Sequence, residues 1–391
     1  MAPSGFGFCL TCGALHSIEA GSAPATDAAR RDGRVVMQRT ANPRTPVRFR
    51  FAPPIALFWA EIAQALFFLT AAVLLLTPTS GYGQVQQPLL PAGMIEHRLP
   101  FAGKERPFLE FQPAKLKPGA PVLIVLHGGG QSARKMFRGA DSPHHEWLPL
   151  AERDGFLLLA PNGTNPQTGD PAGERQVWFG MRNVWRSPLP PPDDSGFLAA
   201  LADWAVNTRG ANPKRIYAAG SSNGGMMTFR LLIDRPDVFA AGASFGATLP
   251  DRPLPQPAIA RPVLIAAGTK DPVVRWEGGE LLQTGIVMLS ARDTLTYWLD
   301  VHGLRGTPPV ARYAFPDREP DDGCRFEVSA WGGSVDVPLV EFWAIRGGGH
   351  WLPSDRQMAV TGKRLLWMGP RCHDVSGPAK AWEFLRRHRL P

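Results

Sequence analysis

The pentapeptide Gly220-Ser221-Ser222-Asn223-Gly224 restricts the possible folds of this chain more than any other feature. The apolar run 215–219 precedes it and the helix-like stretch 225–232 follows it, so it lies between a predicted strand and a predicted helix. A sharp strand-to-helix turn needs small residues two positions on either side of its central residue. In a chain with 41 glycines the pattern could also be a plain glycine-rich turn, but the flanking elements favour a nucleophile elbow that presents Ser222.

Three other apolar runs are predicted to be buried strands. Each is followed by a loop that contains either glycines or a side chain able to take part in catalysis. They cover 121–126, 262–267 and 337–345. The first leads into a loop that contains Gly128 and Gly129, where backbone N–H groups can approach a ligand without obstruction by side chains. The second leads to Asp271 and the third to His350. The chain order Ser, Asp, His is that of the α/β-hydrolases.

These residues have complementary chemical roles. A serine hydroxyl is a weak nucleophile, so we expect His350 to take the proton of Ser222 as it attacks an acyl carbon. Asp271 would hold the imidazole in the required tautomer. The predicted oxyanion hole consists of the N–H of Asn223, the residue after the nucleophile, and an N–H from Gly128 or Gly129.

Alternatives exist for each role. Asp271 precedes a proline and could belong to a simple turn, in which case Asp251 is the most plausible substitute acid. His302 and His373 are weaker candidates for the base. The segment His144-His145-Glu146 suggests a metal site, but adjacent histidines at a helix start point in different directions and no third ligand follows. We therefore expect no metal and no other cofactor.

Four segments carry a resemblance to the secreted poly(3-hydroxybutyrate) depolymerase and feruloyl esterase-like α/β-hydrolases. They are Leu126-His127-Gly128-Gly129-Gly130, Gly220 to Met226, Gly268 to Val274, and Gly347-Gly348-Gly349-His350. The resemblance extends from about residue 95 to the C-terminus. It implies an α/β-hydrolase fold with a mainly parallel central sheet and helices on both faces, and a Ser-His-Asp site that cleaves esters.

The alternation of elements along the chain also predicts a mainly parallel sheet. Predicted strands cover 96–101, 107–111, 121–126, 156–160, 215–219, 240–244, 262–267, 310–313 and 337–345. Predicted helices cover 145–154, 196–207, 223–234, 290–301 and 377–388. Ligands of such sheets bind at the carboxyl ends of the strands, which is where the four motif loops fall.

Tryptophans near these loops are candidate substrate contacts. Trp276 and Trp351 follow Asp271 and His350 closely in the sequence, and Trp178 lies on a predicted loop before the elbow. Aromatic side chains at such positions can stack on a ring or contact an apolar chain, although large aromatics also fill cores.

The N-terminal region has the pattern of an export signal. Arginines between 39 and 50 precede an apolar stretch over 55–76, and small residues follow it. We predict an extension over 1–83, cleaved near Gln84, and a catalytic domain over 84–391. An uncleaved membrane anchor is the alternative. In a secreted protein, extracellular or periplasmic, Cys324 and Cys372 could form a disulfide, whereas Cys9 and Cys12 lie before the predicted cleavage point.

Composition agrees with a globular enzyme, since 44% of the residues are hydrophobic and only 19% are charged. The net charge is +8, and arginines between 30 and 50 contribute to it; no nucleic acid recognition motif is present in the sequence, so we expect no nucleic acid partner. The sequence predicts a secreted serine carboxylic ester hydrolase that acts on hydroxybutyrate oligomers or on feruloyl or acetyl esters. A serine peptidase of the same fold and a binding protein without turnover are the alternatives. The expected partner is a small-molecule or oligomeric ester, and a membrane only if the N-terminal segment is retained.

Overall fold

The computed structural model describes residues 90–139, 142–180, 189–281, 284–356 and 363–391. The predicted export signal, its cleavage point and the pair Cys9 and Cys12 lie outside the described residues. Within the described ranges no helix is both long enough and apolar enough to cross a membrane.

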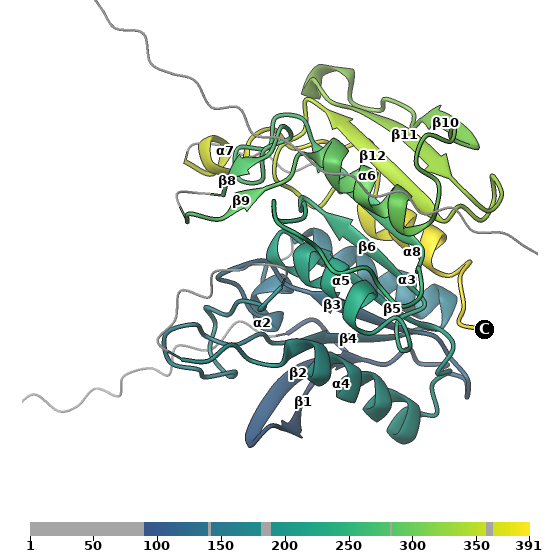
Figure 1. Cartoon of the computed structure of the whole chain (residues 1–391). Helices are drawn as coiled ribbons and strands as arrows, with labels where there is room; N and C mark the ends of the chain where they lie inside the picture. The colour runs from purple at the N-terminus through teal and green to yellow at the C-terminus, as the bar shows by residue number, and fades with distance from the viewer. Residues whose placement is uncertain (1–89, 140–141, 181–188, 282–283, 357–362) are drawn as a thin grey trace, which may run out of the picture. The chain divides into compact units, whose positions relative to one another are not determined.

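One large sheet forms the centre of the described part (Figure 1), with its strands in the order β1-β2-β4-β3-β5-β6-β7-β12-β11-β10. The strands are β1 (Met94–Phe101), β2 (Lys104–Phe111), β3 (Val122–Leu126), β4 (Leu157–Pro161), β5 (Ile216–Ser221), β6 (Ala241–Phe245), β7 (Val263–Gly268), β10 (Ala311–Ala314), β11 (Arg325–Trp331) and β12 (Val340–Arg346). Pairing is parallel from β4 to β12 and antiparallel at both edges.

Helices cover both faces of this sheet (Figure 1). One apolar core contains residues of α4 (Asp194–Arg209), α5 (Asn223–Asp234) and α6 (Ala291–Val301). The other contains residues of α2 (Ala133–Met136), α3 (Trp147–Asp154) and α8 (Gly377–Leu385). The strand β3 contributes Val122 and Ile124 to the first core, and Leu123 and Val125 to the second. Its continuous apolar sequence follows from burial on both faces, and the predicted layered architecture is confirmed.

Shorter elements complete the described part. They are the 3-10 helices η1 (Pro143–Glu146) and η2 (Pro320–Asp322), the helix α7 (Lys363–Met368), and a small sheet of β8 (Gly279–Glu280) and β9 (Val287–Met288). The strand β11 was not among the predicted strands. Polar residues alternate with buried ones along it, and it pairs with β12 in antiparallel register.

Candidate active site

Ser222 lies at the turn between β5 and α5, with φ 55° and ψ −121°. This backbone region is unfavourable for a residue with a side chain and costs of the order of 1–3 kcal/mol. Two hydrogen bonds hold the turn: the N–H of Ser222 donates to the carbonyl of Phe245 (2.8 Å), and the N–H of Met226 donates to the carbonyl of Ser222 (3.0 Å). Such a turn lifts the serine hydroxyl away from the sheet at the carboxyl end of β5.

The turn requires glycine at both ends of the pentapeptide, because neighbouring backbone atoms leave no space for a side chain there. A methyl group on Gly220 would lie 2.3 Å from the carbonyl of Gly224. A methyl group on Gly224 would lie 2.2 Å from the carbonyl oxygen of Leu126, the last residue of β3. The elbow is therefore packed directly against the strand that leads into the loop 127–130.

His350 and Asp271 form a buried hydrogen-bonded pair. Nδ1 of His350 lies 2.6 Å from Oδ2 of Asp271, and the two residues are 7% and 5% exposed. The other carboxylate oxygen accepts hydrogen bonds from the N–H groups of Val273 and Val274, both at 2.8 Å. Since a carboxylate can only accept, the proton of the histidine lies on Nδ1 and Nε2 is left as the basic nitrogen.

The end of β6 brings this pair next to the elbow. Phe245 accepts the hydrogen bond from Ser222, and the next residue, Gly246, contacts the histidine. A methyl group on Gly246 would lie 3.2 Å from Nδ1 of His350 and 3.7 Å from Oδ2 of Asp271. The backbone of Ser222 and the His350–Asp271 pair therefore both adjoin the segment Phe245–Gly246 at the carboxyl end of β6.

The loop 127–130 passes close to the candidate nucleophile. A methyl group on Gly128 would lie 3.7 Å from Cβ of Ser222. His127, which is fully buried, fixes the loop: its Nδ1 donates to the carbonyl of Gly128 (2.8 Å), and its Nε2 accepts from the N–H of Gly163 (3.0 Å). Burial lowers the pKa of His127 to about 4, so the ring is neutral and serves as a structural bridge at ordinary pH.

The side chain of Asn223 is bonded to Trp178, which leaves its backbone N–H as the predicted oxyanion-hole donor. The side-chain oxygen accepts from the N–H of Trp178 (2.7 Å), and the side-chain nitrogen donates to the carbonyl of Trp178 (3.1 Å). The N–H of Asn223 belongs to the first turn of α5, where backbone donors have no partner within the helix and the helix dipole favours negative charge. These side-chain bonds of Asn223 and His127 were not part of the sequence prediction.

The three candidate substrate tryptophans have different environments. Trp178 is 1% exposed, and its indole N–H donates to the carbonyl of His127 (3.1 Å). Trp276 is 8% exposed and packs on Phe342, with 5.8 Å between ring centroids. Both rings fill space in the core and Trp178 supports the loop 127–130, and direct substrate contact by these two tryptophans stays a prediction. Trp351 is half-buried, with its indole N–H on the carbonyl of Gly369 (2.9 Å).

The alternative candidates lie elsewhere. Asp251 is exposed, and the described hydrogen bond of His350 to a carboxylate is made by Asp271. The ring of His302 bonds to the carbonyl of Arg261 (3.1 Å), and that of His373 bonds to the carbonyl of Arg356 (2.8 Å).

The suggested metal segment has other contacts. His145 bonds to the carbonyl of Phe137 (2.9 Å), and Glu146 accepts hydrogen bonds from Ser354 and Ser376. In the part of the chain that the structure describes, no group of three or more His, Cys, Asp or Glu residues is arranged to hold a metal ion.

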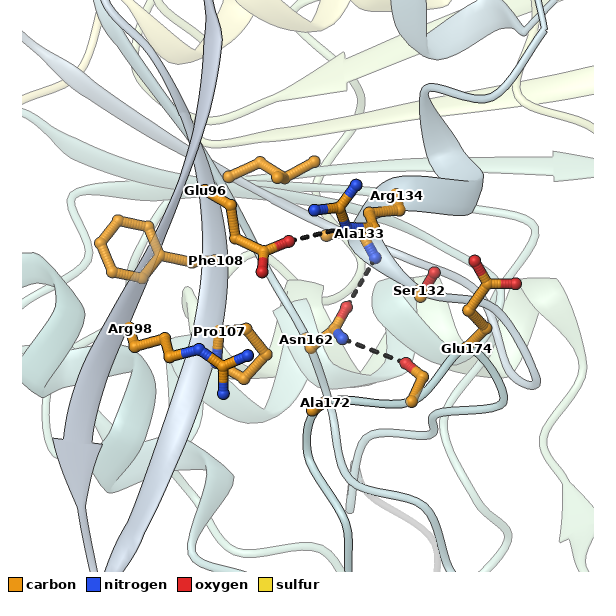
Figure 2. Close-up of a pocket in the computed structure, with 12 residues that line it drawn as sticks. Glu96, Arg98, Pro107, Phe108, Ser132, Ala133, Arg134, Asn162, Ala172 and Glu174 are labelled. Atoms are coloured by element: carbon orange, nitrogen blue, oxygen red, sulfur yellow. Dashed lines mark hydrogen bonds and ion pairs between the residues drawn. The ribbon is translucent and has the colours of Figure 1, made fainter. Parts of the chain in front are cut away.

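A cavity of about 200 Å³ lies between the hairpin β1–β2 and the start of α2. Figure 2 shows the ion pair of Glu96 with Arg134 (2.7 Å), and Asn162, whose side-chain oxygen accepts from the N–H of Ala133 (2.7 Å). Ser222, Asp271 and His350 are not among the residues that line it. We therefore locate the candidate active site by the geometry of the three residues and not by this cavity.

Comparisons with known proteins agree with the fold. The model of the prolyl oligopeptidase family matches residues 197–248, which include the elbow. The chain is 29% identical over 143 residues to feruloyl esterase B of Thermothelomyces thermophilus, covering 34% of this chain and 42% of the relative. It is 33% identical over 238 residues to feruloyl esterase B of Piromyces equi, covering 59% of this chain and 39% of the relative.

A solved structure, an acetyl xylan esterase from Aspergillus awamori, matches 70% of this chain and 98% of its own with a TM-score of 0.47 and 16% identity. The alignments span less than half the length of the two feruloyl esterases. The predicted resemblance to feruloyl esterase-like α/β-hydrolases is confirmed, and the chain has the α/β-hydrolase fold.

Proposed function

We propose that this protein is a serine carboxylic ester hydrolase that works through an acyl-enzyme formed on Ser222. The observation that carries the proposal is the buried 2.6 Å bond between His350 and Asp271, which adjoins Gly246 next to the residue that binds the N–H of Ser222 in its elbow. The similarity to proteins named feruloyl esterase supports an ester as substrate.

In the proposed mechanism the hydroxyl of Ser222 attacks the acyl carbon while Nε2 of His350 takes its proton. Asp271 stabilises the imidazolium that forms and stays ionised. The N–H groups of Asn223 and of Gly128 or Gly129 stabilise the negative charge on the carbonyl oxygen. The imidazolium then protonates the leaving alcohol, and water activated by the same imidazole releases the acid.

We propose feruloyl or acetyl esters of plant polysaccharide, or hydroxybutyrate oligomers, as the substrate class, with Trp351 as the tryptophan that contacts it. Export to an extracellular or periplasmic location is part of the proposal, and the disulfide between Cys324 and Cys372 supports it, since such bonds persist in oxidising compartments.

The test compares hydrolysis of p-nitrophenyl acetate and butyrate by the full chain and by Ser222→Ala. We expect a burst and turnover in the wild type and neither in the variant. A peptidase is the second candidate, because the family model that matches residues 197–248 is that of prolyl oligopeptidases. Cleavage of a proline-containing peptide without cleavage of either ester would favour it. Equal rates of ester hydrolysis by the wild type and Ser222→Ala would refute the assigned nucleophile.

A further inference from the structure

The loop that carries His350 packs between two chain segments, and the disulfide joins these segments. Cys324 and Cys372 have their Cα atoms 5.6 Å apart. On one side, a methyl group on Gly347 would lie 2.0 Å from the carbonyl oxygen of Gly323, directly before Cys324. On the other side, a methyl group on Gly348 would lie 3.0 Å from the sulfur of Cys372. The half-cystines therefore flank the loop just before the histidine.

Backbone hydrogen bonds attach the histidine itself to the segment that ends in Cys372. The N–H of Gly349 donates to the carbonyl of Pro370 (2.7 Å), and the N–H of His350 donates to the carbonyl of Met368 (2.6 Å). We call residues 368–372 the histidine shelf. Because the shelf accepts both hydrogen bonds, its position determines where the backbone of His350 lies.

The other half-cystine belongs to the sheet. Cys324 directly precedes β11, which pairs with β12, and β12 leads into the loop of His350. The disulfide therefore closes a ring that runs from β12 through the loop and the shelf to β11 and back to β12. Asp322 reinforces the closure, since its carboxylate accepts from the N–H of Cys324 (2.7 Å) and from the N–H of His373 (3.0 Å).

We propose that this disulfide positions His350 for proton transfer, so that esterase activity depends on the redox state of Cys324 and Cys372. The inference rests on the proposed function and assigns both cysteines as positioning residues. A dithiol reductant would supply two electrons and two protons, break the S–S bond, leave two thiols and itself become a disulfide. The shelf would then be held to β11 by hydrogen bonds and packing alone, and His350 would sample positions unsuited to proton transfer.

The experiment measures kcat and KM of the full chain for p-nitrophenyl acetate in three forms: oxidised wild type, dithiol-reduced wild type and the double variant Cys324→Ser with Cys372→Ser. Misplacement of a catalytic group by about 1 Å can cost about a hundredfold in rate, so we expect kcat to fall about ten- to a hundredfold with KM nearly unchanged. Hydrogen exchange should accelerate at the amides of Gly349 and His350 but not at that of Ser222.

The control for a general loss of stability is Leu158→Ala, a core substitution on β4. It should lower the urea midpoint of unfolding about as much as the loss of the disulfide does, and leave kcat unchanged. Should the double variant fail to fold, Asp322→Asn tests the same closure with the disulfide intact. It should accelerate amide exchange in the loop and lower kcat, in both cases by less than dithiol reduction of the wild type does.

Unchanged kcat and unchanged exchange in a reduced enzyme whose four cysteines all titrate as thiols would overturn the proposal, and so would unchanged values in Asp322→Asn. The exchange readout does not depend on activity. If the wild type and Ser222→Ala hydrolysed esters equally, the proposed function would fail, while exchange at Gly349 and His350 would still report whether the disulfide positions the loop.

Discussion

Asp271 has three donors around its carboxylate, namely His350 and the two valine N–H groups. Asp271→Asn replaces an oxygen with an amide nitrogen that cannot accept, so the imidazole loses its required tautomer. We expect kcat to fall by about 10⁴-fold, the loss typical of such a replacement in a catalytic triad. Steady-state kinetics with p-nitrophenyl butyrate provide the measurement.

The matched control is Asp251→Asn, because Asp251 was the alternative acid and its side chain is exposed. It should leave kcat and KM near the wild-type values. A loss with Asp251→Asn as large as that with Asp271→Asn would reverse the assignment of the acid.

The candidate reactive residues could be selected from the sequence because each follows a predicted strand within a distinctive loop, as Ser222 and His350 do. The contacts that hold these residues and their loops in place could not be predicted from the sequence. The bond of His127 to Gly163 joins residues 36 positions apart, and no local pattern marks it. The burial of Trp178 and Trp276 was equally hidden, because a tryptophan beside a catalytic loop can face a ligand or fill the core, and only the packing decides.

The elements around the elbow are packed so closely that a single methyl group should disrupt them. In Gly224→Ala the new carbon would lie 2.2 Å from the carbonyl oxygen of Leu126 and 2.7 Å from that of His127, so α5 and the end of β3 would have to separate. Overpacking of this kind typically costs about 1–3 kcal/mol, and we expect at least that loss in the free energy of unfolding. Urea denaturation provides the measurement.

Gly128→Ala is the control for this substitution. Its new methyl group would meet its nearest neighbours at 3.6–3.8 Å, which is ordinary contact, and Gly128 does not have a positive φ. We expect its free energy of unfolding to change by less than about 1 kcal/mol. Equal stability of the two variants would contradict the packing described for the elbow.

Every predicted strand and helix exists in the structure, with ends that differ by at most three residues. Continuous apolar runs such as β3 were easy to identify because they are buried on both faces. The strand β11 lacks such a run: Phe326, Val328 and Ala330 are buried, while the residues between them are not. A half-exposed antiparallel strand next to an edge strand carries only a period-two signal, which a search for apolar runs misses.

The whole molecule contains buried histidines that link its stability to pH. Burial lowers the pKa of His127, His144 and His388 to about 4 in each case. In the unfolded chain a histidine takes up its proton near pH 6.5. Between these values the unfolded state binds more protons than the native state, so each group destabilises the native state as the pH falls from 6.5 to 4.

His388 allows this linkage to be measured away from the candidate active site. Its ring packs on Phe384, with 4.8 Å between centroids, and its Nε2 has no hydrogen-bond partner among the described residues. His388→Phe keeps an aromatic ring there and removes the titrating group. The free energy of unfolding of the variant relative to the wild type should therefore rise as the pH falls from 6.5 to 4, by at most about 3 kcal/mol.

The comparison between variant and wild type is more informative than the wild-type curve alone, because buried carboxyls act in the opposite direction. Burial raises the pKa of Asp194, Glu146 and Glu341, so these groups stabilise the native state at low pH and that contribution is lost as the pH rises through their native pKa. Their effect is common to both proteins and cancels in the difference.

Above about pH 7.5 the difference in the free energy of unfolding between His388→Phe and the wild type should be constant, since His388 is then unprotonated in both the native and the unfolded state. A difference that stays constant from pH 8 to pH 4 would mean that His388 is as free to take up a proton in the native state as in the unfolded chain.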